Sequence, residues 1–196
     1  MLDELTHQIE TCRLCKDRFA ATATQHAPRP VVWLSRATPR ILVAGQAPGA
    51  RVHASGRPFT DPSGDRLRAW MGVTAETFYD RERIAILPMA FCFPGYDMSG
   101  ADLPPPVLCA RTWRSTVLSG LGPATLTLLV GRYALDWHLA RGKSVRDHVK
   151  AWRDHAPKTF PLPHPSWRNN AWLKKNPWFE TELLPALRTA VAEALA

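Results

Sequence analysis

The chain has 196 residues, of which 45% are hydrophobic, with a formal net charge of +8 and a pI of about 9.8. This composition excludes a disordered chain, and the longest apolar runs, such as 125–130, are far too short to cross a bilayer. The basic balance suits a polyanionic partner such as nucleic acid, although a solvated basic surface would give the same charge. We expect residues 1–196 to form one monomeric domain without membrane contact, and the polar N-terminus predicts a cytoplasmic protein.

The predicted elements alternate between helix and strand along the chain. Apolar residues at 2, 5 and 9 predict a short helix, and residues 17–39 are expected to run extended over the surface. Apolar runs predict four strands, at 41–44, 84–91, 125–130 and 159–162. Periodicity and turn residues predict helices after Ser63, which we expect to be an N-cap, and at about 109–118, 131–138, 145–152 and 179–195.

This alternation predicts an α/β fold with a parallel sheet that helices cover on both faces. In such sheets the ligand site lies outside the carboxyl ends of the strands. Three suggestive segments directly follow predicted strands: GQAPG (45–49), CFPG (92–95) and PHPSWRNN (163–170). We therefore expect these segments to meet at one edge of the sheet.

The four cysteines suggest a metal site. Cys12 and Cys15 form a C-x2-C pair, and Cys92 and Cys109 lie in loop-like sequence with sixteen residues between them. Four thiolates can hold zinc or an iron–sulfur cluster, and a cage uses all four cysteines. A thioredoxin-type redox pair shares the C-x2-C spacing but leaves Cys92 and Cys109 unexplained, and four unrelated thiols are the remaining alternative.

A glycine-punctuated turn ends the first predicted strand. GQAPG matches neither the phosphate-binding P-loop nor the dinucleotide-binding glycine pattern. Its glycines and Pro48 suggest a rigid backbone wall against which a planar ligand could lie, with Phe59 as the opposite face. The alternative is an ordinary strand-to-helix turn and a core phenylalanine.

Basic and aromatic residues are interleaved in 164–179, HPSWRNNAWLKKNPWF. This mixture suits backbone phosphates and unstacked bases. Of its tryptophans, Trp172 and Trp178 are expected to pack in the core.

These motifs resemble those of the uracil-DNA glycosylase superfamily, where GxAPG, GRPF with a glycine five residues beyond the phenylalanine (here Gly64), and HPS occur in this order. The cysteines resemble those of the iron–sulfur branch, family 4, in which four cysteines hold a [4Fe–4S] cluster. The resemblance covers about residues 9–185. It implies a three-layer α/β/α sandwich with a central four-stranded parallel sheet, and removal of deaminated cytosine, which is uracil, from DNA.

Cleavage of the bond between base and deoxyribose builds negative charge on the base and positive charge on the sugar, after the nucleotide has left the duplex. The resemblance implies that neutral His164 donates a hydrogen bond to uracil O2, that Phe59 stacks on the base and that Ser166 binds a phosphate. The backbone side of the pocket would comprise Gly45, Ala47, Pro48 and Gly49. Residues 167–170, which include Asn169, are the candidates for the wedge that fills the vacated space, with Arg168 expected to reach it.

The sequence also departs from the family at two places. Gln46 stands where the family has Glu, and Asp61 stands where it usually has Gly. Asp61 would then orient the attacking water, unless it caps the following helix. Pro88 or Met89 falls near the position of an Asn that recognises the uracil edge, so a backbone group or Asn169 would do so here.

The departures leave alternatives open. The substrate could instead be another deaminated base, such as hypoxanthine or xanthine. Two further alternatives are a module that binds a damaged base without cleaving it, and an iron–sulfur adaptor that binds RNA or protein.

Overall fold

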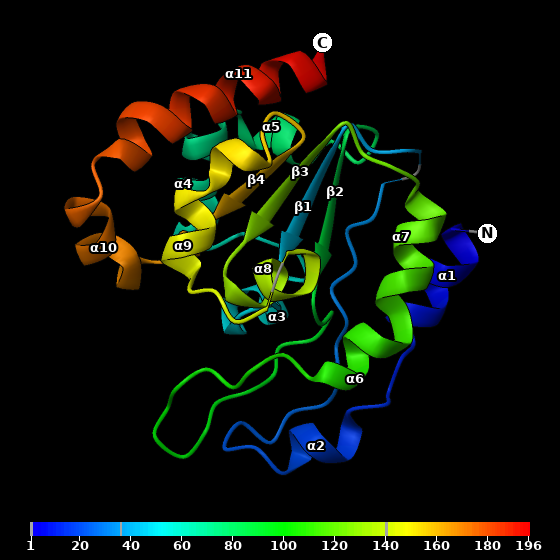
Figure 1. Ribbon diagram of the computed structural model, residues 1–196. Helices are drawn as coiled ribbons and strands as arrows, with labels where there is room; N and C mark the ends of the chain where they lie inside the picture. Colours follow the sequence, from blue (N-terminus) through cyan, green and yellow to red (C-terminus); the bar gives the residue numbers. More distant parts are fainter. Residues whose placement is uncertain (1, 36, 140) are drawn as a thin grey trace.

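The computed structural model describes residues 2–35, 37–139 and 141–196 (Figure 1). Its centre is a four-stranded parallel sheet in the order β2-β1-β3-β4, as predicted. The strands are β1 (Ile41–Gly45), β2 (Ile84–Pro88), β3 (Leu126–Val130) and β4 (Thr159–Leu162). Because all four strands run in one direction, their carboxyl ends finish at the same edge.

Helices cover both faces of this sheet (Figure 1). The α-helices are α1 (Leu2–Glu10), α2 (Lys16–Ala20), α3 (Ala50–Ser55), α4 (Pro62–Met71), α5 (Ala75–Phe78), α6 (Val107–Cys109), α7 (Ser115–Leu121), α8 (Arg132–His138), α9 (Val145–Lys150), α10 (Asn170–Lys175) and α11 (Leu184–Leu195). Two π-helical segments, Ala110–Arg114 and Phe179–Leu183, lead into α7 and α11, and Trp152–Asp154 and Trp167–Asn169 are 3-10 turns.

The two core layers follow from the alternation of side chains along β1. Ile41 and Val43 point to one face, where they join the core formed with α4, α5 and α11. Leu42 and Ala44 point to the other face, toward α1, α7 and α8. The near-continuous burial of β1 is typical of a parallel strand covered on both sides. These layers confirm the predicted three-layer α/β/α sandwich.

Several predicted boundaries were wrong, each for a local reason. The second strand ends at Pro88, where β1 gives way to the 45–49 turn and the Met89 amide is shared between the carbonyls of Gly45 and Gln46, both at 2.9 Å. Ser63 lies inside α4, and Asp61 is its N-cap, with Pro62 at the first helical position.

The segment 17–39 is not wholly extended, because α2 occupies its start. The short helices α3, α5 and α10 were not predicted. Trp172 and Trp178 are only half-buried, but they pack against the core through edge-to-face contacts with Phe179. Within the described residues, no helix has the length and apolar character needed to cross a membrane.

Candidate functional site

A cleft of about 710 Å³ opens at the carboxyl edge of the sheet. It is lined by all the residues for which the sequence predicts a role in base binding or cleavage: Gly45, Gln46, Ala47, Pro48, Gly49, Phe59, Asp61, His164, Ser166, Arg168 and Asn169. The three segments that follow predicted strands therefore meet as expected. Their meeting follows from the parallel sheet, since each loop begins where a strand ends at this edge.

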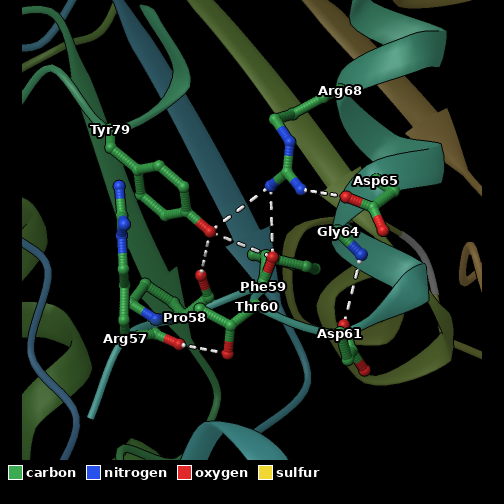
Figure 2. Close-up of polar contacts among 9 residues, drawn as sticks. All are labelled: Arg57, Pro58, Phe59, Thr60, Asp61, Gly64, Asp65, Arg68 and Tyr79. Carbon is green, nitrogen blue, oxygen red and sulfur yellow. Dashed lines mark hydrogen bonds and ion pairs between the residues drawn. The ribbon is translucent and has the colours of Figure 1, made fainter. Parts of the chain in front are cut away.

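Phe59 is held in a strained backbone conformation, with φ of 55°. Its carbonyl accepts hydrogen bonds from Arg68 Nη1 at 3.1 Å and from Tyr79 Oη at 3.0 Å (Figure 2). Tyr79 also donates to the carbonyl of Pro58 at 2.9 Å, and the Arg57 guanidinium lies over its ring at 3.5 Å. These contacts fix the loop that carries the Phe59 ring.

Gly64 gives the Phe59 carbonyl the space it needs. A Cβ at position 64 would lie 1.8 Å from that oxygen, which no rotamer change can relieve. On the other side, the tip of the Phe59 ring lies close to Gly45, where an added Cβ would stand 3.7 Å from it. The spacing of GRPF and Gly64 thus fixes one aromatic ring beside the end of β1.

His164 follows β4 and is largely shielded from water by the walls of the cleft. Burial lowers the pKa of His164, while the charges of Asp61 and Asp102 partly offset this effect by raising it. Its imidazole is therefore neutral at pH 7 and still carries one ring N–H that can donate a hydrogen bond.

The sequence left two alternatives for Asp61, a group that orients water at the cleft and a cap of the following helix. Its Oδ1 accepts from the Gly64 amide at 3.2 Å and caps α4 (Figure 2). It also lines the cleft and lies close enough to His164 to affect its pKa. The helix cap is therefore shown, and it leaves the carboxylate at the edge of the cleft.

The loop after His164 is braced from within. Asn169 Nδ2 donates to the carbonyl of His164 at 2.6 Å, so this amide holds the loop. Arg168 pairs with Asp102 across the cleft at 2.9 Å. Among the described residues no hydrogen bond or ion pair holds the Trp167 side chain, and 73% of its surface is exposed.

Three cleft residues were missed from the sequence. Arg66 in α4 donates to the Ser166 carbonyl at 3.1 Å, and Tyr96 and Asp102 form an isolated bridge in the loop after β2. All three line the cleft. Only the pairing of distant loops brings them there, so no local pattern could identify them.

All four cysteines line a second cavity, together with apolar side chains such as Ile9 and Trp113. Burial and the neighbouring thiols raise the pKa of Cys92 to about 12, and burial raises that of Cys109 to about 11. Cys109 Sγ also accepts from the Phe91 amide at 3.5 Å. Among the described residues, no three His, Cys, Asp or Glu side chains are grouped so that one ion could bind them all.

The sequence model of the uracil DNA glycosylase superfamily matches residues 32–188, which is most of the chain. The chain belongs to this superfamily. The match begins after Cys12 and Cys15, so it does not bear on the family 4 branch or on the cysteine site.

We predict that Gly64→Ala destabilises the protein. Helix propensity alone would make Ala more stable by about 1 kcal/mol, but the clash with the Phe59 carbonyl reverses the sign by an overpacking cost of about 1–3 kcal/mol or more. Thermal unfolding measures the difference. Gly49→Ala is the matched control, because a Cβ there meets nothing within 4 Å; a stabilised Gly64→Ala variant would contradict the packing argument.

We also predict that His164 titrates below 6.5, its ordinary pKa, because burial disfavours the imidazolium. The neutral form is favoured in the folded state, so its contribution to stability is complete above pH 6.5 and is lost as the pH falls toward the lowered pKa. NMR of the imidazole ring measures this titration. Asp61→Asn should lower the pKa further, and a rise in that variant would show that the two groups do not interact as described.

Proposed function

We propose that this protein is a DNA glycosylase that extrudes a deaminated base, uracil above all, and hydrolyses its N-glycosidic bond to leave an abasic site. Superfamily membership supports a glycosylase acting on DNA. The observation that carries the proposal is the convergence of His164, Phe59 and the 45–49 turn on one cleft. The net charge of +8 suits a DNA partner.

His164 would stabilise the departing base. When the bond breaks, its electron pair leaves with the base, and a neutral imidazole can donate a hydrogen bond to the oxygen on which the charge gathers. The lowered pKa of His164 supports this role, since the ring is neutral at pH 7. A protonated ring would instead carry its charge in a largely buried site, at a cost in desolvation.

Phe59 would stack on the extruded base, and the 45–49 turn would form the backbone wall beside it. The hydrogen bonds from Arg68 and Tyr79 to the Phe59 carbonyl support this role, because a ring that is already held in place loses little entropy when the base binds. A strained φ held by surrounding contacts is typical of functional sites.

Asp61 would orient the attacking water. Its position at the cleft near His164 supports this hypothesis, and its role as helix cap fixes the carboxylate in place. Gln46 also lines the cleft and could hold the water, but an amide cannot accept the proton of that water.

Trp167 is the stronger candidate for the wedge that enters the duplex. Its exposed ring lies on the rim of the cleft, whereas Arg168 is engaged with Asp102. Apolar side chains inserted between base steps are a common means of holding an unstacked site open. Ser166 would bind a phosphate beside the lesion.

A module that binds a damaged base without cleaving it is the second candidate. Gln46 favours it, because the family's acidic residue is absent from the turn. The two candidates share the same cleft and differ only in whether an abasic product forms.

Incubation with duplex and single-stranded oligonucleotides containing uracil, hypoxanthine or xanthine, followed by alkaline strand scission, tests the proposal. We expect cleavage at uracil, with a loss of about 10²–10³-fold in the single-turnover rate for His164→Ala. Asp61→Asn should slow cleavage by about 10²-fold, and an unchanged rate would remove Asp61 from the mechanism. Tight binding to uracil-containing DNA without abasic product would instead establish the binding module.

We further propose that Cys12, Cys15, Cys92 and Cys109 hold a [4Fe–4S] cluster with a structural role. In a zinc site all four sulfurs touch one ion at about 2.3 Å, whereas a cluster offers each cysteine its own iron and accepts wider spacing. The single cavity lined by all four cysteines supports a shared site, and the resemblance to family 4 favours the cluster, with zinc as the alternative. The site would tie α1 and α2 to the loop between Cys92 and Cys109.

Freshly purified protein should therefore show a broad visible absorption band and contain iron. Cys92→Ser should abolish the band and lower the thermal stability, because the loop between Cys92 and Cys109 loses its attachment. Equimolar zinc in a colourless protein would identify the alternative metal.

A further inference from the structure

Arg114 is a buried cation without a counter-ion. Its side chain is the largest among the fully buried ones, with 1% of its surface exposed. It ends the π-helical segment between α6 and α7. None of the ion pairs formed by the described residues includes Arg114. Buried charges are normally paired, so this arrangement needs a physical reason.

The hydrogen-bond partners of Arg114 are all neutral. Nη1 donates to the carbonyls of Leu87 at 3.3 Å and Pro88 at 3.1 Å, and Nη2 donates to His138 Nε2 at 2.6 Å. Burial and the nearby guanidinium lower the pKa of His138 to about 4, so that imidazole is uncharged at pH 7. Burial lowers the pKa of Arg114 only to about 10, so the guanidinium keeps its charge. These contacts occupy Nη1 and Nη2, whereas the buried Nε–H has no hydrogen-bond partner among the described residues. None of the contacts cancels the positive charge.

Arg114 contacts the backbone of Pro88, which lines the cleft where the strands end, and we take this side as the deep end of the cleft. Pro88, whose carbonyl Arg114 binds, ends β2 and pairs in register with Gly45. Gly45, Ile86 and Pro88 all line the cleft at the ends of the strands. An extruded base enters such a cleft ring first, while its sugar and phosphates stay toward the mouth, where the DNA strand continues.

We propose that Arg114 stabilises the base anion that forms at the deep end of the cleft, through its uncancelled positive charge and without touching the base. This inference rests on the proposed glycosylase function. The bond pair goes to the base nitrogen, the water oxygen bonds to the sugar carbon, and the proton released by the water neutralises the base. Because the base lies deeper than the sugar, the guanidinium is closer to the developing negative charge than to the positive one.

A purely structural role of Arg114 would not require its positive charge. Even a buried ion pair can often be replaced by apolar side chains of similar volume with little loss of stability. The variants must therefore change the charge of Arg114 separately from its packing.

The test compares Arg114→Met, which removes the charge, with Arg114→Lys, which keeps it. Single-turnover rates are measured on oligonucleotides containing uracil or 5-fluorouracil, whose anion is intrinsically more stable. We expect Arg114→Met to slow uracil cleavage by roughly tenfold. This is the order of magnitude expected when one charge that does not touch the base is removed from a medium of intermediate dielectric. The loss on 5-fluorouracil should be smaller, and Arg114→Lys should keep most of the rate. Affinity for an uncleavable substrate analogue should stay unchanged.

Arg111→Met is the matched control, because Arg111 lies in the same π-helical segment but is exposed. Should Arg114→Met fail to fold in a thermal unfolding assay, His138→Glu provides a second variant, which sets a carboxylate beside the intact guanidinium and should give the same substrate-dependent loss. Equal losses on both substrates, or equal losses in the Met and Lys variants, would overturn the inference. A wild-type protein that cleaves neither substrate would overturn the glycosylase proposal itself.

Discussion

The common direction of the four strands is the constraint on which the cleft depends. Because every strand ends at the same edge, the loops after β1, β2 and β4 begin along one edge of the sheet, although more than a hundred residues separate Gly45 from His164. The core on both faces holds the strands in register, so the loops start from fixed points. The positions of Gln46, Pro88 and His164 follow from this packing before any contact within the cleft is formed.

Local strain then determines the shape of the cleft. Phe59 adopts a conformation that costs about 1–3 kcal/mol for a non-glycine residue, and hydrogen bonds from Arg68 and Tyr79 to its carbonyl offset that cost. Gly64 is required because this same carbonyl occupies the space of its missing side chain. One backbone oxygen thus links a helix, a loop and the aromatic ring, which explains why the motif needs a fixed spacing between phenylalanine and glycine.

The sequence was sufficient for the sheet and for the motif residues of the cleft, because both depend on local patterns. Apolar runs marked the four strands, and short motifs marked the residues of the turn, Phe59 and His164. It failed where a side chain chooses between nearby partners, as in the capping of α4 by Asp61 in place of Ser63. It also could not reveal Arg66, Asp102 or Arg114, because their partners lie far away in the chain and no local periodicity encodes them.

Burial lowers the pKa of two basic side chains near the cleft, His164 and Arg114, but leaves them in different charge states. The pKa of an imidazole lies close to neutrality, so modest desolvation is enough to keep His164 uncharged. A guanidinium begins so far above neutrality that even the burial of Arg114 leaves it charged. Desolvation of similar kind therefore yields a neutral donor at the cleft and a permanent cation behind it. Under the proposed function, a departing base anion would meet complementary groups in both, since the first would donate a hydrogen bond on contact and the second would act through its field.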